Sequence, residues 1–245
     1  MGKIVVTTGG NGTLGKSVVK KLIKEGYFVI SLVHTLSDEK KVNILEVETD
    51  LSDINAIQRS IERVKLIISK IEIESLSIIH MAGIYEKQKF PVKIGDMQKW
   101  NDIFWVNTFS FYFIVSELVD LFKLIRRGNI IAVSSNLTKL VNNDTAAYIG
   151  AKAALEKITV QLAYQLGEYN ICCNIICPGF FFSAMSNNIP LKVLEEIKKN
   201  TPLNQVVTEE TIATVILDIL CSKNLGMTGQ IITVDGGNTI GFAKN

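Results

Sequence analysis

Three polar side chains are spaced so that they could share one catalytic cleft. Tyr148 and Lys152 are four residues apart in a segment whose composition predicts a helix, so we expect the phenol and the ammonium on one helix face. Ser135 stands thirteen residues before the tyrosine, at the end of the apolar run 130–133. A buried parallel strand would end there, and open α/β sheets bind their ligands at that edge. A hydroxyl, a phenol and an amine would then meet at one place.

Proton transfer at neutral pH would require a change in the tyrosine pKa. A free tyrosine titrates near pH ~10, and a neighbouring ammonium lowers that value because it favours the phenolate. Lys152 lies one helical turn beyond Tyr148 and could do this. Tyr148 is then expected to act as general acid and base, and Ser135 to hydrogen-bond a carbonyl oxygen. Taken singly, the three residues would be a half-buried aromatic, a surface charge and a strand-end cap; their joint spacing favours chemistry.

The elements that would position these residues alternate between strands and helices. Seven short β-rich runs predict strands, and the segments between them have helical periodicity. The chain has no linker or break in composition, so we expect residues 1–245 to form a single α/β domain with a Rossmann-type, doubly wound parallel β-sheet flanked by helices. Residues 180–205 lack a strand pattern and are expected to form a flap over the substrate. The expected strands are 4–7, 28–33, 45–47, 76–79, 130–133, 171–177 and 230–234, and the main expected helices are 16–23, 54–69 after a Ser52 cap, 97–124, 148–167 and 208–220.

A glycine-rich loop follows the first expected strand and opens the first expected helix. Its sequence is TGGNGTLG, residues 8–15. Glycines let the backbone approach a pyrophosphate, and a helix N-terminus supplies free N–H groups and a positive dipole end. The loop therefore predicts a dinucleotide site, with a tight structural turn as the alternative. The residues expected to bind the cofactor here are Thr8, Gly9, Asn11, Gly12, Thr13, Leu14 and Gly15.

The end of the second expected strand bears on which dinucleotide is bound. NAD sites usually place Asp or Glu here to hold the ribose hydroxyls, whereas this chain has Val33, His34 and Thr35. Because no carboxylate would repel a 2′-phosphate, NADP(H) is favoured over NAD(H). His34 could meet that phosphate, or it could be an ordinary surface histidine.

Two further polar residues stand in apolar surroundings. Asn107 interrupts the long apolar segment 97–124, and a buried polar group is costly without partners, so it is expected to have a fixed partner or a task. His80 ends the fourth expected strand. A catalytic role is conceivable for it, but a lone histidine at a strand end is more often a hydrogen-bonded structural residue.

Composition excludes several classes of function. The chain is 47% hydrophobic and 20% charged with a net charge of +2, and its basic residues are scattered, which gives no reason to expect nucleic acid as a partner. No apolar run reaches the ~18–20 residues of a membrane span, and Met1-Gly2-Lys3 leads directly into a strand without a signal-peptide pattern. Of the four cysteines, Cys172, Cys173 and Cys177 share one expected strand. With Cys221 they are expected to be structural thiols of a cytoplasmic protein, with no metal site.

These motifs together resemble the short-chain dehydrogenase/reductase superfamily along nearly the whole chain. The glycine loop, the serine thirteen residues before Tyr-x-x-x-Lys and the later Pro-Gly break fall in family order and at family-like spacing. The chain looks most similar to the single-domain branch that includes 3-oxoacyl-carrier-protein reductases. The motifs that carry the resemblance are 8–15, Asp50, Ala82-Gly83, Asn107, Ser135, Tyr148 to Lys152, Asn174 to Gly179, Thr228 to Gln230 and Asp235 to Gly237.

Two departures from that branch concern the cofactor end. The branch has T-G-x-x-x-G-x-G, but this chain has Thr13 where its second glycine would stand and fits T-G-x-x-G-x-x-G through Gly9, Gly12 and Gly15. That spacing resembles the extended and atypical branches. Residues 80–83 are His-Met-Ala-Gly in place of Asn-Asn-Ala-Gly. Extended members carry a substrate domain after the proline break, whereas here the sequence reads as flap, helix and final strand, so we expect a single-domain enzyme with a variant loop.

The resemblance implies an NAD(P)(H)-dependent oxidoreductase that interconverts a carbonyl and a secondary alcohol. A 3-oxoacyl thioester is one candidate substrate. By the same resemblance, Lys152 also binds the nicotinamide ribose, Asn107 holds a water of a proton relay, and Ser183 contacts the carboxamide. A homo-oligomer, tetramer or dimer, is the family expectation. The further positions implied for cofactor binding are Asp50, Leu51, Ala82, Gly83, Pro178 and Gly179.

The substrate pocket is expected to be mixed and partly apolar, which admits acyl thioesters, steroids, sugars and small ketones. Two rival functions remain open. A non-catalytic dinucleotide-binding sensor would keep the glycine loop, and a nucleotide-sugar epimerase or dehydratase would suit the variant loop. The residues expected to line the pocket are Asn136, Leu137, Val141, Asn142, Phe180, Phe181, Phe182 and Met185.

Overall fold

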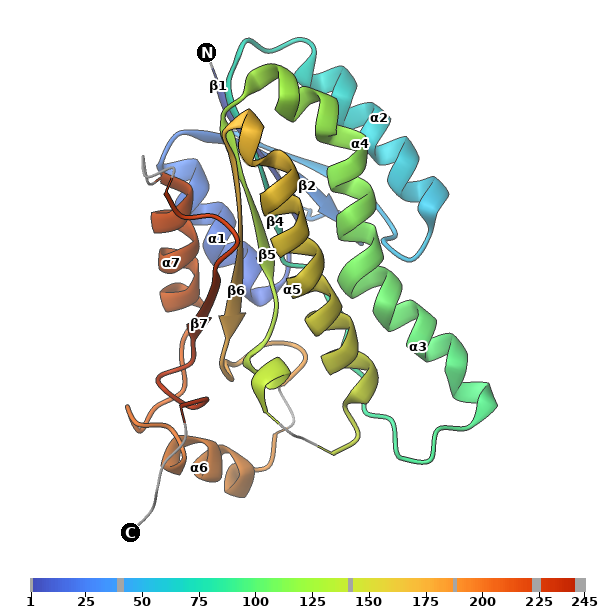
Figure 1. The fold of residues 1–245 in the computed structure, drawn as a ribbon, viewed down its shortest axis with the longest axis vertical. Coiled ribbons are helices and arrows are strands. Elements are labelled where there is room, and N and C mark those ends of the chain that lie inside the picture. Colours follow the sequence, from blue (N-terminus) through green and yellow to red (C-terminus); the bar gives the residue numbers. More distant parts are fainter. Residues whose placement is uncertain (1, 39–41, 141–142, 187–188, 222–225, 241–245) are drawn as a thin grey trace.

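Seven parallel strands form one sheet at the centre of the molecule (Figure 1). The computed structural model describes residues 2–38, 42–140, 143–186, 189–221 and 226–240. The strand order is β3-β2-β1-β4-β5-β6-β7, so the chain winds outward in both directions from β1 and β4. The doubly wound parallel sheet expected from the sequence is confirmed. The strands are β1 (Gly2–Thr8), β2 (Tyr27–Val33), β3 (Ile44–Glu48), β4 (Ile73–His80), β5 (Gly128–Val133), β6 (Ile171–Pro178) and β7 (Ile231–Val234).

The strands are apolar because helices cover the sheet on both faces. Successive side chains of a strand point to opposite faces, so Ile4 and Val6 join one hydrophobic cluster and Val5 joins the other. The first cluster holds α2 (Ile54–Ile68), α4 (Ser110–Ile125) and α5 (Ala146–Leu166) against the sheet. The second holds α1 (Thr13–Lys24) and α7 (Glu209–Cys221) against the opposite face.

Two shorter helices lie toward the carboxyl ends of the strands. These are α3 (Met97–Phe104), which leads into α4, and α6 (Leu191–Lys199) within the segment expected to be a flap. In Figure 1 both lie near the bottom of the view, toward which β6 points. The edge of the sheet where ligands are expected is therefore flanked by these two segments.

The segment expected as one helix over 97–124 is interrupted. Residues Trp105–Phe109 form a short π-helix between α3 and α4. Asn107 lies inside it, and its Nδ2 donates to the carbonyl of Ile103, four residues earlier, at 2.8 Å. The side chain thus takes up a carbonyl that an α-helix would pair with a backbone N–H, and such π segments are frequent at functional sites.

The helix cap expected at Ser52 lies one residue further on. Asp53 is the N-cap of α2, and its carboxylate accepts from the amide of Asn55 at 2.9 Å. Ser52 instead donates its amide and its hydroxyl to Asp50, at 2.8 and 2.7 Å. An aspartate satisfies the free amides of a first turn as well as a serine does, so the expectation of a Ser52 cap was wrong.

None of the four cysteines, all of which lie in the described part of the chain, forms a disulfide. Cys172, Cys173 and Cys177 are buried in β6, and Cys221 is exposed at the end of α7. Burial raises the pKa of Cys177 to about 12, which keeps this thiol protonated and unreactive. Among the described residues, no group of three or more His, Cys, Asp or Glu side chains is placed to hold a metal ion. No helix in the described ranges is long and apolar enough to cross a membrane.

Candidate active site

Ser135, Tyr148 and Lys152 meet beyond the carboxyl end of β5. Ser135 is buried and caps the short 3-10 helix Asn136–Lys139, where its Oγ accepts from the amide of Leu137 at 3.2 Å. Tyr148 and Lys152 occupy the first two turns of α5. The Lys152 ammonium lies 5.9 Å from the centroid of the Tyr148 ring, and the phenol is hydrogen-bonded to Ser135. The structure therefore brings together the three residues that the spacing singled out.

Lys152 is a buried cation. Only 3% of the residue is exposed, and its Nζ donates to the carbonyl of Val133 at 2.9 Å. Burial lowers its pKa to about 8, while the neighbouring Cys177 and Glu156 act in the opposite direction. The Lys152 side chain is thus held by a carbonyl of β5, and it is mostly protonated at neutral pH.

The pKa of Tyr148 is raised rather than lowered. Burial of the phenol raises it to about 12, and the hydrogen bond with Ser135 works against that rise. Ser135, rather than the expected Lys152, supplies this opposing effect. Tyr148 therefore holds its proton at neutral pH, as a general acid must.

Asn107 has a fixed partner and an unused acceptor, as its polarity in an apolar segment suggested. Its Nδ2 donates to the carbonyls of Ile84 and Ile103 at 2.9 and 2.8 Å. Its Oδ1 is buried without a hydrogen-bond partner. A Cβ added to Gly83 would lie 2.6 Å from this Oδ1 and 3.3 Å from the Lys152 Nζ. This oxygen thus lies beside Gly83 and the lysine, where it can accept from a further donor.

His80 is the structural residue that its position suggested. It is fully buried, and its Nδ1 lies 2.9 Å from Oγ1 of Thr8. The same hydroxyl accepts from the amides of Met81 and Ala82, at 3.2 and 3.1 Å. Burial lowers the pKa of His80 to about 3, so the ring is neutral. Thr8, expected to bind cofactor, joins the ends of β1 and β4 and sets the path of residues 81–83.

The glycine loop is shaped by close approaches that only glycine permits. A Cβ on Gly15 would lie 2.1 Å from the carbonyl oxygen of Gly9, and one on Gly10 would lie 2.1 Å from Oγ of Ser31. Gly9 has a φ of +68°, and a Cβ there would stand 2.9 Å from the backbone of Ala82. Gly10 was missed by the motif comparison, since the matching pattern runs through Gly9, Gly12 and Gly15.

The start of α1 is open to an anion. Gly12 is its N-cap and provides no side-chain hydrogen bond, and the first turn carries no acidic residue. The first amides of Thr13, Leu14 and Gly15 have no acceptor within the helix. Asn11 lies at the mouth of the loop and donates to the carbonyl of Thr35 at 2.9 Å. The loop residues therefore fit the pyrophosphate of a dinucleotide.

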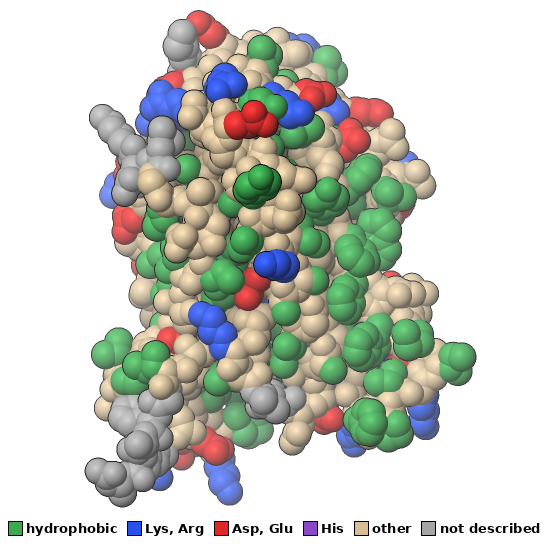
Figure 2. Space-filling view, viewed as in Figure 1, with side chains coloured by type: hydrophobic (Ala, Val, Ile, Leu, Met, Phe, Trp, Pro, Cys, Tyr) green, Lys and Arg blue, Asp and Glu red, His purple; other side chains and the backbone are tan. Residues whose placement is uncertain are grey.

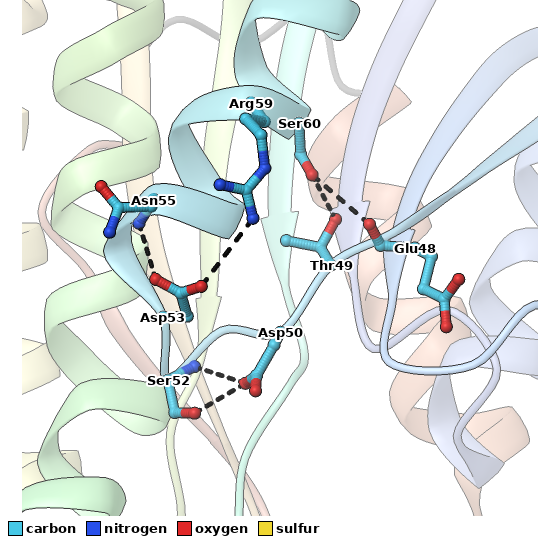
Figure 3. A network of polar contacts seen from close by, with 8 residues as sticks. All are labelled: Glu48, Thr49, Asp50, Ser52, Asp53, Asn55, Arg59 and Ser60. Atoms are coloured by element: carbon cyan, nitrogen blue, oxygen red, sulfur yellow. Dashed lines mark hydrogen bonds and ion pairs between the residues drawn. The ribbon is translucent and has the colours of Figure 1, made fainter.

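The residues expected to bind the far end of the cofactor follow β2 and β3. His34 is exposed there, and its charge contributes to lowering the pKa of Asp50, below the larger effect of the hydrogen bonds from Ser52. Figure 3 shows Asp50 held in the turn that leads from β3 into α2. Leu51, the other expected residue, is buried.

A carboxylate near His34 and Asp50 was not predicted from the sequence, and it belongs to Glu46. Glu46 of β3 accepts from the amide of Ser37 at 2.7 Å and from its hydroxyl at 2.9 Å. The loop after β2 is thus fastened to β3 through this side chain. Its position on a strand, rather than at the strand end, gave no signal.

Beyond β6 the chain turns sharply back toward β7. Pro178 is buried at the end of β6, and the amide of Gly179 donates to the carbonyl of Val234 at 2.8 Å. A Cβ on Gly179 would lie 2.7 Å from Cβ of Asp235, so this close approach requires glycine. Ser183 follows in a tight turn, where its amide donates to Oγ of Ser186 at 2.8 Å.

The residues expected to contact substrate divide into several groups. Asn136 is buried, and its Nδ2 donates to Asn238 at 3.1 Å and to Asp235 at 3.5 Å, so it holds the turn after β7. Phe181 packs against the second hydrophobic cluster. Phe180 meets Phe182 edge-on with ring centroids 5.5 Å apart, and Met185 is exposed. Asn142 and Val141 lie outside the described residues.

Two residues near the catalytic group were not anticipated. The ring of Tyr85, two residues after Gly83, meets the Tyr148 ring edge-on at 5.1 Å between centroids. Glu156 lies one turn beyond Lys152, and its Oε1 accepts from the Ser134 hydroxyl at 2.6 Å. Neither belongs to the motif set, although the i,i+4 spacing of Lys152 and Glu156 was visible in the sequence.

A separate cavity of about 760 Å³ opens beside β7. Its lining includes Lys139, Gln205, Thr208, Asp235 and Ile240, and none of Ser135, Tyr148 or Lys152. It is therefore distinct from the place where these three residues meet.

Comparison with known proteins places this arrangement in a family. The model of the family described as enoyl-(acyl carrier protein) reductase matches residues 12–239. A 3-oxoacyl-(acyl-carrier-protein) reductase of Buchnera aphidicola is 26% identical over 244 residues, which cover 96% of this chain and 96% of that protein. A 2,3-dihydro-2,3-dihydroxybenzoate dehydrogenase of Bacillus subtilis is 28% identical over 262 residues, with 98% and 97% covered.

The fold agrees with a solved structure of the same kind. A short chain dehydrogenase family protein from Francisella tularensis superposes with a TM-score of 0.82 and 25% identity, covering 98% of this chain and all of that one. The match therefore extends over nearly the whole chain. The chain therefore belongs to the short-chain dehydrogenase/reductase superfamily, oxidoreductases that interconvert carbonyls and alcohols with NAD or NADP.

Proposed function

We propose that this chain is an NADP(H)-preferring reductase of 3-oxoacyl thioesters that uses Tyr148 as its acid and base. One observation carries the assignment of roles. A protonated phenol, a serine hydroxyl and a buried ammonium meet at the carboxyl end of β5, and the unused Oδ1 of Asn107 lies beside the ammonium. Such a group suits proton delivery to an oxygen that gains negative charge.

The chain's own residues would hold the dinucleotide along the carboxyl edge of the sheet. The open amides at the start of α1 would bind the pyrophosphate, and Lys152 would reach the nicotinamide ribose. The backbone of Ala82-Gly83 and of Pro178-Gly179 would flank the cofactor, with Ser183 near the carboxamide. When bound, the nicotinamide supplies the hydride, and the protein supplies position and charge.

Each catalytic side chain has a distinct task in this proposal. Ser135 uses an Oγ lone pair for the amide of Leu137, which leaves its proton to donate to the substrate carbonyl. Tyr148 gives its phenolic proton to the same oxygen in reduction and takes it back in oxidation. The Lys152 charge stabilises the phenolate that is left. Oδ1 of Asn107 would accept a hydrogen bond from a water of the proton relay, which returns a proton to Tyr148.

The preference for NADP(H) rests on the end of β2. His34 is exposed where an NAD enzyme commonly places a carboxylate. The Glu46 carboxylate is occupied by Ser37, which limits its repulsion of a 2′-phosphate.

The substrate assignment rests on the similarity to 3-oxoacyl-(acyl-carrier-protein) reductases together with the apolar segment after β6. Phe182 and Met185 are about half exposed, at 48% and 54%, on the segment proposed as the flap, residues 180–205. Exposed apolar side chains beside a polar catalytic group suit an acyl chain that carries a carbonyl. The 28% identity to a dehydrogenase of a cyclic diol makes cyclic ketones and diols the second class to examine.

A further part of the proposal is self-association as a dimer or tetramer. Figure 2 shows apolar side chains gathered over α3 and α4. Met97 of α3, Phe109 of the π-helix and Tyr112 of α4 are exposed at 48%, 44% and 47%. Contiguous exposed apolar surface of this kind marks interaction sites. Light scattering of the purified protein checks this, and a monomer at micromolar concentration would contradict it.

The function is tested by cofactor consumption. NADPH and NADH oxidation is measured with 3-oxoacyl thioesters, cyclic ketones and ketoses, and the reverse reaction with the matching alcohols. We expect turnover with a 3-oxoacyl thioester and NADPH. Tight NADPH binding without turnover on any substrate would favour a sensor instead, and binding of a UDP- or GDP-sugar would favour an epimerase.

A further inference from the structure

The carboxylate of Glu156 accepts hydrogen bonds from two hydroxyls and one thiol close to Ser135. Its Oε1 accepts from Oγ of Ser134 at 2.6 Å, from Oγ1 of Thr138 at 2.8 Å and from Sγ of Cys177 at 3.3 Å. The donors come from the end of β5, the 3-10 helix after it and the end of β6. One carboxylate on α5 thus ties together the three segments that surround Ser135.

The donors are direct neighbours of residues already placed in the site. Ser134 precedes Ser135 and also donates to the carbonyl of Lys152, at 3.4 Å. Cys177 precedes Pro178, where the chain leaves β6. A carboxylate that accepts several donors is a rigid anchor, because ionised acceptors make the stronger hydrogen bonds. Its loss would loosen the backbone on both sides of the catalytic serine.

The carboxylate also bears on the charge of Lys152. Burial lowers the pKa of this lysine to about 8, and Cys177 and, to a smaller extent, Glu156 act to raise it. Glu156 is half-buried and lies one turn away on the same helix, so its field is less screened than that of a surface charge.

The other titratable groups near Lys152 leave Glu156 as the relevant anion. His80 of β4 has a pKa near 3 and is neutral. Cys177 of β6 and Tyr148 of α5 both have pKa values of about 12 and keep their protons. Lys139, on the 3-10 helix, is a cation whose charge acts on Cys177. Among the described residues that shift the Lys152 pKa, Glu156 is the one carboxylate.

We propose that Glu156 is a positioning residue of this active site, which keeps the Lys152 ammonium charged and fixes Ser134 beside the catalytic serine. The role rests on the proposed function, because a charged Lys152 matters only if Tyr148 must give up its proton. The electrostatic part can nevertheless be measured without any substrate.

The test is a direct titration of Lys152. Isotope-labelled lysine is followed by NMR in the full chain without substrate, and Lys152→Arg assigns the resonance. Glu156→Gln removes the charge and keeps the shape, Glu156→Asp keeps the charge, and Glu168→Gln makes the same charge change at an exposed position beyond the end of α5. Glu156→Met is a second neutral variant if the glutamine variant does not fold.

We expect the Lys152 pKa to fall by about one pH unit in the neutral Glu156 variants. It should stay near its wild-type value in Glu156→Asp and Glu168→Gln. In turnover, the alkaline limb of kcat/KM should move to lower pH by the same amount in Glu156→Gln and return in Glu156→Asp. A merely structural role would lower activity without moving this limb.

An unchanged Lys152 pKa in a folded neutral variant would overturn the proposal, whatever the activity shows. A wild-type protein with no turnover would instead contradict the proposed function and leave the titration result standing. The two failures are therefore distinguishable.

Discussion

Asn107 and Lys152 point their polar atoms at the same spot beside Gly83. A Cβ placed there would lie 2.6 Å from Oδ1 of Asn107 and 3.3 Å from Nζ of Lys152. The first distance is shorter than real Cβ contacts allow, and both side chains are buried and held by backbone carbonyls. Gly83 therefore keeps open the space in which Asn107 and Lys152 meet.

Gly83→Ala should lower turnover while the fold persists. The added methyl would displace the Asn107 oxygen and crowd the lysine, so we expect kcat to fall about 10- to 100-fold, as misplaced catalytic groups commonly cause. Steady-state kinetics and thermal unfolding measure the two effects. Gly167→Ala is the matched control, since a Cβ there meets nothing within 4 Å. Equal activity of both variants would show that the space beside Gly83 is not needed for turnover.

The pH dependence of reduction should be set by Lys152 at its alkaline side. Tyr148, with a pKa of about 12, stays protonated throughout the working range. Lys152, with a pKa of about 8, loses its charge as the pH rises through that value. We expect kcat/KM to fall above about pH 8. Lys152→Arg keeps a cation at all these pH values, so its residual activity should lack this limb; an unchanged limb would assign it to another group.

Acid should weaken the fold through His80. Its pKa is about 3 in the folded chain and 6.5 when unperturbed. Between these two pH values the unfolded state binds a proton that the folded state does not bind. The contribution is fully present above pH 6.5 and is lost as the pH falls toward the folded value. From pH 7 to pH 5 the expected loss is about 2 kcal/mol.

Urea unfolding at several pH values measures this loss. His80→Asn removes the titrating ring and offers a polar atom to Thr8, so its stability should vary less with pH even if it is lower overall. A variant that keeps the full wild-type slope would show that other groups cause the acid sensitivity.

The nucleotide preference should respond to the end of β2. His34→Asp places a carboxylate where the 2′-phosphate of NADP is proposed to lie, near the existing Asp50. We expect the ratio of kcat/KM for NADPH to that for NADH to fall by about tenfold, which corresponds to about 1.4 kcal/mol. His34→Gln is the neutral control. An unaltered ratio in both variants would move the phosphate site away from His34.

Local sequence patterns were sufficient to predict the strands of the sheet. Each strand is a short apolar run because both faces of a parallel sheet are covered, and this signal does not depend on distant contacts. The spacing of Tyr148 and Lys152 on one helix was equally local. The convergence of Ser135 on them followed because carboxyl ends of parallel strands share one edge.

What could not be predicted depends on contacts between distant segments. The π-helix around Asn107 arises from one side chain competing for the carbonyl of Ile103, which periodicity does not register. Gly10 is required by Ser31 on the next strand. The side chain of Asn136 donates to Asn238 and Asp235, which follow the last strand. The pKa of Tyr148 was expected to fall, but burial depends on the folded surroundings and raises it.

Tyr148 is proposed to deliver the proton, and the Tyr148→Phe variant tests this role. The substitution removes one oxygen and leaves the ring to meet Tyr85. NADPH binding, followed by fluorescence, and turnover of the best substrate are measured on the same preparation. We expect an unchanged dissociation constant for NADPH and a kcat that is lower by at least about 100-fold. A variant that binds NADPH and turns over at a near wild-type rate would contradict it.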